Sequence, residues 1–160
     1  MKILYFGGQK SGKSLLAEKK ALSLDKKPYY IATYDNSFGD KEMLSRINKH
    51  QKQRKNLFLT IESPKDFSMI KEGKTYLIDC LSMWLLNLID DEKEIKKQLD
   101  FLESVDANIV FVLNDVNSGV IPMDKLSRRY VDLSGEVGQR VAGFCDEVYE
   151  VKLGLEIQLK

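Results

Sequence analysis

Residues 7–14 read GGQKSGKS, and this stretch decides the fold. It fits the pattern G-x-x-x-x-G-K-[ST], whose fixed places are taken here by Gly7, Gly12, Lys13 and Ser14. The apolar run 2–6 before it predicts a buried strand, and residues 15–21 after it have the composition of a helix. A strand, a glycine-rich turn and a helix in this order make a P-loop, where backbone N–H groups and the helix N-terminus bind phosphate oxygens. We therefore predict that the chain binds a nucleoside triphosphate.

Two side chains of this loop have predicted roles of their own. Lys13 would reach the β- and γ-phosphates, and Ser14 would present its hydroxyl oxygen to Mg²⁺. The residues predicted to contact nucleotide are Gly7, Gly8, Gln9, Lys10, Ser11, Gly12, Lys13 and Ser14. A glycine turn without a ligand is the alternative, but the flanking strand and helix favour the P-loop.

Length and composition predict one nucleotide-binding domain over residues 1–160. A chain of 160 residues can bury one core and is too short for two ordinary domains. Hydrophobic residues make up 43%, and the net charge of +1 gives no reason to expect a nucleic-acid or membrane partner. Cys80 and Cys145 adjoin apolar runs, which favours reduced core residues over a disulfide. No signal peptide or membrane-spanning run is visible, so we expect a cytoplasmic protein.

Strands alternate with helices along the rest of the chain. The predicted strands cover 29–33, 57–61, 75–79 and 108–113, and the predicted helices cover 40–55, 64–71, 81–104 with a break near 90–91, and 124–145. Residues 147–152 and 155–159 alternate in polarity around Gly154, which predicts a hairpin. This order indicates an α/β fold with a mostly parallel sheet, helices on both faces and an antiparallel edge hairpin.

Ligands of such sheets bind beyond the carboxyl ends of the strands, so the residues there are candidates for the site. Thr33 ends one predicted strand and Tyr34 and Asp35 follow it, although an ordinary strand exit explains them equally well. Asp79 ends an apolar strand, as a Walker B acid does. Together with the P-loop, this position predicts a metal-side carboxylate near Ser14.

The predicted helix 40–55 has an unusual charge balance. Its segment 41–55 contains six lysine or arginine residues and one acidic residue. Arg46, His50 and Arg54 follow at four-residue spacing, so they share one face. His50 is the only histidine, and the neighbouring cations favour its neutral, nucleophilic form. From spacing alone, a solvated basic helix with an incidental histidine remains the favoured interpretation.

The motifs have a specific order: GGQKSGKS at 7–14, YIAT at 30–33, RINKHQKQR at 46–54, TIE at 60–62, LIDCLSMWLLNL at 77–88, NDVNSGVIP at 114–122 and LSRRYVDLSGEVGQRVA at 126–142. In this order they resemble the bifunctional adenosylcobinamide kinase / adenosylcobinamide-phosphate guanylyltransferase family of cobalamin biosynthesis. The R-I-x-x-H-x-x-x-R helix and the last segment are more specific than the P-loop, and the resemblance covers nearly the whole chain.

The resemblance implies two reactions. One transfers the γ-phosphate of ATP or GTP to the aminopropanol hydroxyl of adenosylcobinamide. The other transfers GMP from GTP to adenosylcobinamide phosphate through a phosphoramidate on a histidine, releasing pyrophosphate and giving adenosylcobinamide-GDP. His50 occupies the position of that histidine. The resemblance therefore reverses the interpretation from spacing, and it further implies a RecA-type P-loop NTPase fold and a homotrimer.

The family's nucleotide contacts extend beyond the P-loop when they are carried onto matching positions. They fall on Ala32, Thr33, Tyr34, Gln51, Lys52, Gln53, Arg54, Glu62 and Asp79, with Ser14 and Asp79 as ligands of Mg²⁺. The chain has Asp115 and Asn117 where the family usually has Glu and Gly, which bears on corrinoid fit more than on the two chemistries. Alternatives are an enzyme with one of the two activities, a small-molecule kinase of another pathway, and a regulatory protein that uses the nucleotide as a switch.

Overall fold

A computed structural model describes residues 1–35 and 56–160 of the chain. In this part the strands form one sheet of seven, in the order β3-β2-β4-β5-β1-β6-β7. All neighbours are parallel except β6 and β7, which form an antiparallel hairpin. The predicted helix 40–55, with His50 and residues 51–54, lies outside the described residues.

The elements of the described residues have the following bounds. They are β1 (Lys2–Gly7), α1 (Lys13–Leu24), β2 (Tyr29–Ala32), β3 (Leu59–Glu62), β4 (Thr75–Asp79), α3 (Leu81–Asn87), α4 (Glu92–Ser104), β5 (Asn108–Asn114), α5 (Lys125–Phe144), β6 (Glu147–Lys152) and β7 (Leu155–Gln158). The expected α/β fold with a parallel sheet and an antiparallel edge hairpin is confirmed.

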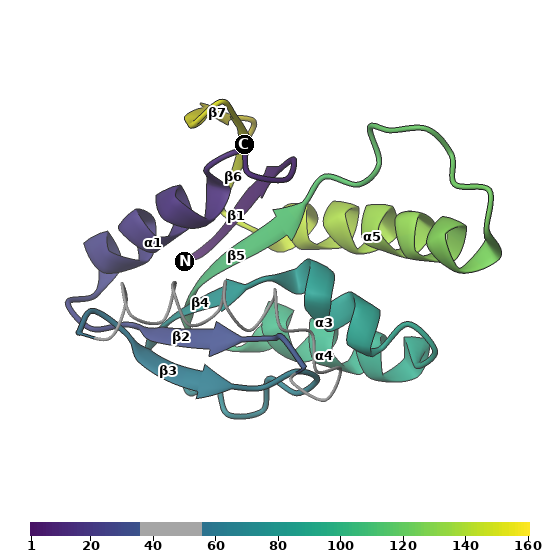
Figure 1. Cartoon of the computed structure of the whole chain (residues 1–160). Helices are drawn as coiled ribbons and strands as arrows, with labels where there is room; N and C mark the ends of the chain where they lie inside the picture. The colour runs from purple at the N-terminus through teal and green to yellow at the C-terminus, as the bar shows by residue number, and fades with distance from the viewer. Residues whose placement is uncertain (36–55) are drawn as a thin grey trace.

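Helices cover both faces of the sheet, because the central strands are apolar on both sides. On one face α1 packs through Ala17 and Ala21 against residues such as Tyr5 and Val112. On the other face α3, α4 and α5 cover a larger cluster that includes Trp84 and Phe111. Figure 1 shows α1 on one side of the strands and these three helices on the other. Trp84 is fully buried in this cluster.

The helix predicted over 64–71 is wrong, because local side-chain hydrogen bonds fix this segment as turns. Asp66 accepts hydrogen bonds from the backbone N–H and the hydroxyl of Ser68, at 2.9 and 2.6 Å. The backbone N–H of Phe67 donates to Gln98 Oε1 at 2.8 Å, a partner on α4. These donors are therefore used outside a helical ladder.

The predicted break in segment 81–104 is confirmed, and its cause is a helix cap. Residues 88–91 separate α3 from α4, and the Asp91 side chain accepts a hydrogen bond from Glu94 N at 3.0 Å. A carboxylate at this place satisfies a free N–H of the first helical turn. None of the helices within residues 1–35 and 56–160 is long and apolar enough to cross a membrane.

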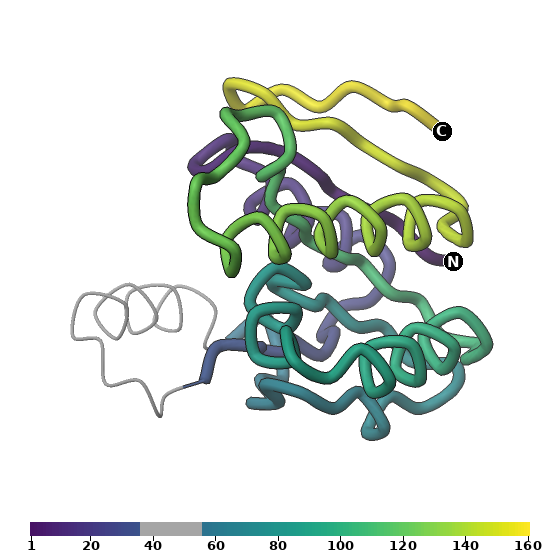
Figure 2. The backbone as a smooth tube through the Cα atoms, turned by 90° about the vertical axis from the view of Figure 1, so that its right-hand side faces the viewer, coloured from purple at the N-terminus to yellow at the C-terminus, as the bar shows by residue number. Residues whose placement is uncertain are grey.

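The parallel strands point their carboxyl ends to one edge of the sheet. The turn after β1 and the loop 115–124 between β5 and α5 both lie there, at the end opposite the N-terminus (Figure 2). They are neighbours because β1 and β5 pair along their length, with Gly7 opposite Asn114. This edge is where the predicted site residues have to meet.

Candidate nucleotide site

The loop after β1 requires glycine for two separate reasons. A Cβ on Gly7 would lie 2.4 Å from the carbonyl oxygen of Val151, so the neighbouring strand β6 leaves no room for a side chain. Gly12 caps α1 with φ of 97°, in the left-handed region that costs glycine little. A Cβ on Gly12 would also lie 3.1 Å from Gly154 Cα in the β6–β7 turn. The loop is thus packed against the C-terminal hairpin.

Backbone hydrogen bonds hold this loop in shape. Ser11 N donates to Gly8 O at 3.2 Å, and Gly154 N donates to Ser11 O at 2.8 Å. Asp115 N donates to Gly7 O at 2.8 Å. The N-terminus of α1 has no side-chain cap, so its first N–H groups can bind an anion. This is the geometry of a phosphate cradle.

Lys13 is the cation of the cradle. It is buried, and its ammonium group donates to Gly8 O at 3.1 Å. Burial lowers the pKa of Lys13, and the negative charge of Asp79 acts in the opposite direction. A bound phosphate would bring the lysine a strong opposite charge in place of a neutral carbonyl. The site therefore gains electrostatic stabilisation when a polyphosphate enters it.

Asp79 faces the first turn of α1. Its Oδ1 lies 3.5 Å from Ser14 Oγ, and its Oδ2 accepts a hydrogen bond from the Tyr30 hydroxyl at 2.9 Å. A carboxylate and a hydroxyl that face each other beside a phosphate cradle fit Mg²⁺, which is usually held by one or two carboxylates together with substrate phosphates and waters. Within residues 1–35 and 56–160, no group of three or more His, Cys, Asp or Glu residues could hold a metal ion.

The exits of β2 and β3 lie beside Asp79. In the register of the sheet, Ala32 is opposite Asp79 on one side and Glu62 on the other. Thr33 Oγ1 donates to Cys80 O at 2.7 Å and accepts from Cys80 N at 3.0 Å. These bonds tie the β2 exit to the β4 exit. The predicted residues Ala32, Thr33, Glu62 and Asp79 are thus brought to one short stretch of the edge.

Asn87 on α3 forms hydrogen bonds to the same region. Its amide nitrogen donates to Thr33 O at 2.8 Å and to Pro64 O at 2.9 Å, so one side chain fixes the chain after both β2 and β3. Sequence reasoning missed Asn87, Tyr30, Cys80 and Gly154 as parts of the site. The only signal for Asn87 and Cys80 was their place in the motif LIDCLSMWLLNL, which assigns them no contact.

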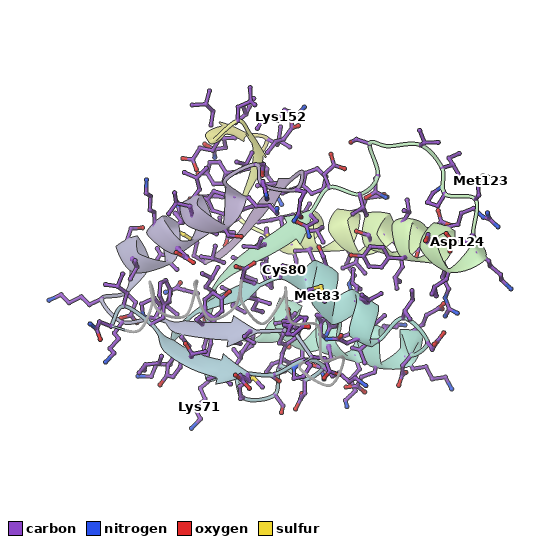
Figure 3. The ribbon with its side chains drawn as sticks, viewed as in Figure 1. Lys71, Cys80, Met83, Met123, Asp124 and Lys152 are labelled. Atoms are coloured by element: carbon purple, nitrogen blue, oxygen red, sulfur yellow. The ribbon has the colours of Figure 1, made fainter. Side chains whose placement is uncertain are left out.

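Cys80 is the one thiol at this edge among the described residues, and its chemistry can be judged. It follows β4 and lies near the middle of the carboxyl edge in Figure 3. Burial and, to a smaller extent, the charge of Asp79 raise the pKa of Cys80 to about 11. The thiol is therefore protonated at neutral pH, which makes it a poor nucleophile.

The loop 115–124 uses its unusual residues to hold its own shape. Asp115 Oδ1 accepts from the backbone N–H groups of Asn117 and Ser118, at 3.1 and 3.2 Å, and its Oδ2 accepts from the Ser118 hydroxyl at 2.6 Å. The Asn117 amide donates to Val131 O on α5 at 2.8 Å. Asp115 and Asn117 thus form contacts that anchor the loop.

The described part of the chain accounts for most of the predicted site residues. Those that lie at the carboxyl edge or just beyond it are the P-loop residues Gly7, Gly8, Gln9, Lys10, Ser11, Gly12, Lys13 and Ser14, together with Ala32, Thr33, Tyr34, Glu62 and Asp79. His50, Gln51, Lys52, Gln53 and Arg54 lie outside the described residues, so their relation to the P-loop stays a prediction.

Fold and loop together define a P-loop NTPase. Strand β5 lies between the P-loop strand β1 and the Asp79 strand β4, which is the RecA-like strand order. The sequence profile described as "Cobinamide kinase / cobinamide phosphate guanyltransferase" matches residues 3–159, and the chain belongs to that family. The family is one of enzymes with two transferase activities, a kinase and a guanylyltransferase.

Several relatives align over the whole chain. The bifunctional adenosylcobalamin biosynthesis protein CobP of Pseudomonas aeruginosa is 37% identical, with 100% of this chain and 98% of the relative covered. The proteins named bifunctional adenosylcobalamin biosynthesis protein CobU of Salmonella typhimurium and Escherichia coli are 30% and 28% identical, with both chains covered completely. The resemblance stated from the motifs is confirmed.

Proposed function

We propose that the protein phosphorylates adenosylcobinamide with ATP or GTP and then transfers GMP from GTP to adenosylcobinamide phosphate, giving adenosylcobinamide-GDP. The observation that carries the proposal is the phosphate cradle with Lys13 buried in it and Ser14 facing Asp79. Both reactions need a bound nucleoside triphosphate, and membership of the family supplies the corrinoid acceptor. We further propose one domain over residues 1–160, acting in the cytoplasm, where these nucleotides are plentiful.

In the kinase step the residues of the cradle act by position and charge. The N–H groups of the loop and the Lys13 ammonium would bind the phosphate oxygens and stabilise the charge that develops during transfer. Ser14 and Asp79 would hold Mg²⁺, which supplies further charge neutralisation when bound. The acceptor hydroxyl loses its proton to solvent as its oxygen forms the new bond to the γ-phosphorus. The bond between the γ-phosphorus and the β–γ bridging oxygen breaks, and the nucleoside diphosphate leaves.

In the guanylyl step we assign the nucleophile to His50. A neutral imidazole nitrogen attacks the α-phosphorus of GTP, the α–β bridging bond breaks, and pyrophosphate leaves. A phosphate oxygen of the acceptor then attacks the same phosphorus, the P–N bond breaks, and His50 is restored. The raised pKa of Cys80 supports this assignment, because it leaves no reactive thiolate at the described edge. The residues that would bind the nucleotide in this step are Gln51, Lys52, Gln53, Arg54, Thr33, Tyr34 and Glu62.

Self-association into a homotrimer is part of the proposal. Support comes from strand β7, an edge strand of the described sheet with Leu155 and Ile157 exposed. Exposed apolar edge strands are unfavourable in a monomer, because they can pair with another chain. Light scattering on the purified protein at several concentrations measures the mass directly.

The decisive experiment uses GTP labelled at the α-phosphate. Incubation with Mg²⁺ should leave label on the protein after denaturation, and that label should be lost in acid and survive alkali, as expected for a phosphoramidate. His50→Ala should bind GTP and carry no label, whereas Lys13→Ala should bind GTP poorly. A wild-type protein that binds GTP without labelling, yet phosphorylates cobinamide, would identify a kinase that lacks the second activity.

A further inference from the structure

Tyr30 contacts the metal-side carboxylate from the neighbouring strand. Strands β2 and β4 are parallel, with Tyr30 opposite Leu77 and Ala32 opposite Asp79. The Tyr30 ring lies on the same face as Leu77 and extends toward the carboxyl edge, so its hydroxyl reaches Asp79 Oδ2 at 2.9 Å. This contact joins two residues that are far apart in the sequence and meet only through the strand order.

The Tyr30 ring is fixed by packing in the core. Tyr30 is buried in the core under α1, and its ring packs edge-to-face on Phe58 with 6.0 Å between the centroids. Such aromatic pairs restrict the position of both rings. Because the ring is fixed by the core, the hydroxyl oxygen has a fixed place beside Asp79 Oδ2.

The two carboxylate oxygens of Asp79 therefore have different partners. Oδ2 accepts from Tyr30, and Oδ1 faces Ser14 Oγ at 3.5 Å. A carboxylate without such a partner turns easily about its last torsion, which has broad minima. Mg²⁺ demands near-ideal octahedral geometry, so a turned carboxylate is a poorer ligand.

We propose that Tyr30 is a positioning residue for the magnesium–nucleotide complex: its hydroxyl fixes Asp79 so that Oδ1 stays directed at Ser14. Tyr30 acts through Asp79 and does not itself contact substrate. The inference rests on the proposed function, in which Ser14 and Asp79 hold Mg²⁺. It adds a residue that neither the P-loop motif nor the strand-ending Asp79 indicates.

The test measures binding, so it needs neither the corrinoid nor turnover. The affinity of GTP with a fluorescent label on the ribose is measured in Mg²⁺ and in EDTA, and the ratio of the two dissociation constants gives the gain from the metal. Tyr30→Phe removes one oxygen and keeps the ring on Phe58. We expect the gain to fall by about tenfold, the usual weight of one hydrogen bond to a charged group, with binding in EDTA unchanged.

Tyr29→Phe is the matched control. Tyr29 is the preceding residue of β2, its ring lies on the other face of the sheet, and it stacks on Tyr76 with 5.1 Å between the centroids. The substitution removes one hydroxyl from the same strand and keeps the stacking. We expect the gain from Mg²⁺ to match that of the wild type.

A double substitution separates positioning from a general structural role. In an Asp79→Ala background, Tyr30→Phe should change the gain from Mg²⁺ no further, because Tyr30 has lost the group through which it acts. An unchanged gain in Tyr30→Phe, a second loss in the Asp79→Ala background, or equal weakening in EDTA would each overturn the proposal. If the wild type itself gains nothing from Mg²⁺, the metal site of the proposed function fails as well, and this outcome is distinguishable from the others.

Discussion

Two loops at the same edge of the sheet are built in opposite ways. The P-loop, residues 7–14, is held mainly by backbone atoms: Gly8 O, Ser11 O and Gly7 O accept hydrogen bonds from backbone N–H groups. The loop 115–124 is held by side chains: Asp115 caps its start, and Arg128 donates to Pro122 O at 3.0 Å and to Met123 O at its end. Both begin directly after paired strands.

The difference follows from what each loop has to present. A phosphate cradle needs free backbone N–H groups and close approach, so glycines and backbone contacts fix it without filling the space for the ligand. The second loop leaves large apolar side chains in solvent: Val120, Ile121 and Met123 are 95%, 79% and 97% exposed. Figure 3 shows Met123 and Asp124 at the far end of this loop, away from Cys80.

The largest effect that the comparison predicts falls on Lys13. Lys13→Ala removes the buried cation of the cradle, and we expect GTP affinity to fall about 100-fold, the weight of a charge-assisted contact to phosphate. Equilibrium binding of fluorescent GTP measures this loss. Lys125→Ala, which removes a cation at the start of α5, is the control and should bind GTP normally. Equal losses in both variants would contradict the assignment of phosphate binding to the P-loop.

A smaller effect is predicted for the backbone packing of the P-loop. Gly7→Ala places a Cβ 2.4 Å from Val151 O, a backbone atom that cannot move aside without shifting β6. We expect the free energy of unfolding to fall by about 1–3 kcal/mol, the usual cost of overpacking. Chemical denaturation followed by circular dichroism measures it.

The adjacent glycine provides the control for this substitution. A Cβ on Gly8 would meet nothing within 4 Å, so Gly8→Ala should change the free energy of unfolding by no more than about 0.5 kcal/mol. A cost in Gly8→Ala as large as that in Gly7→Ala would contradict the view that contact with β6 is what demands glycine at residue 7.

The smallest effect is predicted where the second loop meets α5. A Cβ on Gly135 would lie 3.0 Å from Asn117 Nδ2, the atom that donates to Val131 O. Gly135→Ala should therefore destabilise the protein by about 1 kcal/mol, the net value of one hydrogen bond. In an Asn117→Gly background the same change should stabilise it by about 0.5–1 kcal/mol, because alanine favours a helix more than glycine does.

The effect of Gly135→Ala on stability is expected to change sign between the two backgrounds, which makes the experiment discriminating. Thermal or denaturant unfolding of the wild type, the two single variants and the double variant gives the change in stability in both backgrounds. GTP affinity should stay constant in all four proteins, since the contact belongs to the loop 115–124 and not to the P-loop. If Gly135→Ala has the same sign in both backgrounds, Asn117 does not meet Gly135 as described.

Much of the fold could be predicted because its signals are local. The glycine pattern at 7–14, the apolar strand ending at Asp79 and the hairpin around Gly154 each depend on neighbours in the sequence. The helix predicted over 64–71 failed for a local reason too, since Asp66 and Ser68 form a turn that competes with a helix. An apolar residue in a helix does not always face the core either: Leu126, near the start of α5, is exposed.

The sequence by itself determined that this chain has a P-loop, an α/β alternation and the motifs of its family, because these are written in contiguous residues. Only the tertiary structure decided that β5 separates β1 from β4, that Tyr30 meets Asp79, and that Gly154 supports Ser11. The physical reason is that strand order and register arise from packing of the whole sheet. Side chains many residues apart meet only after those choices are made.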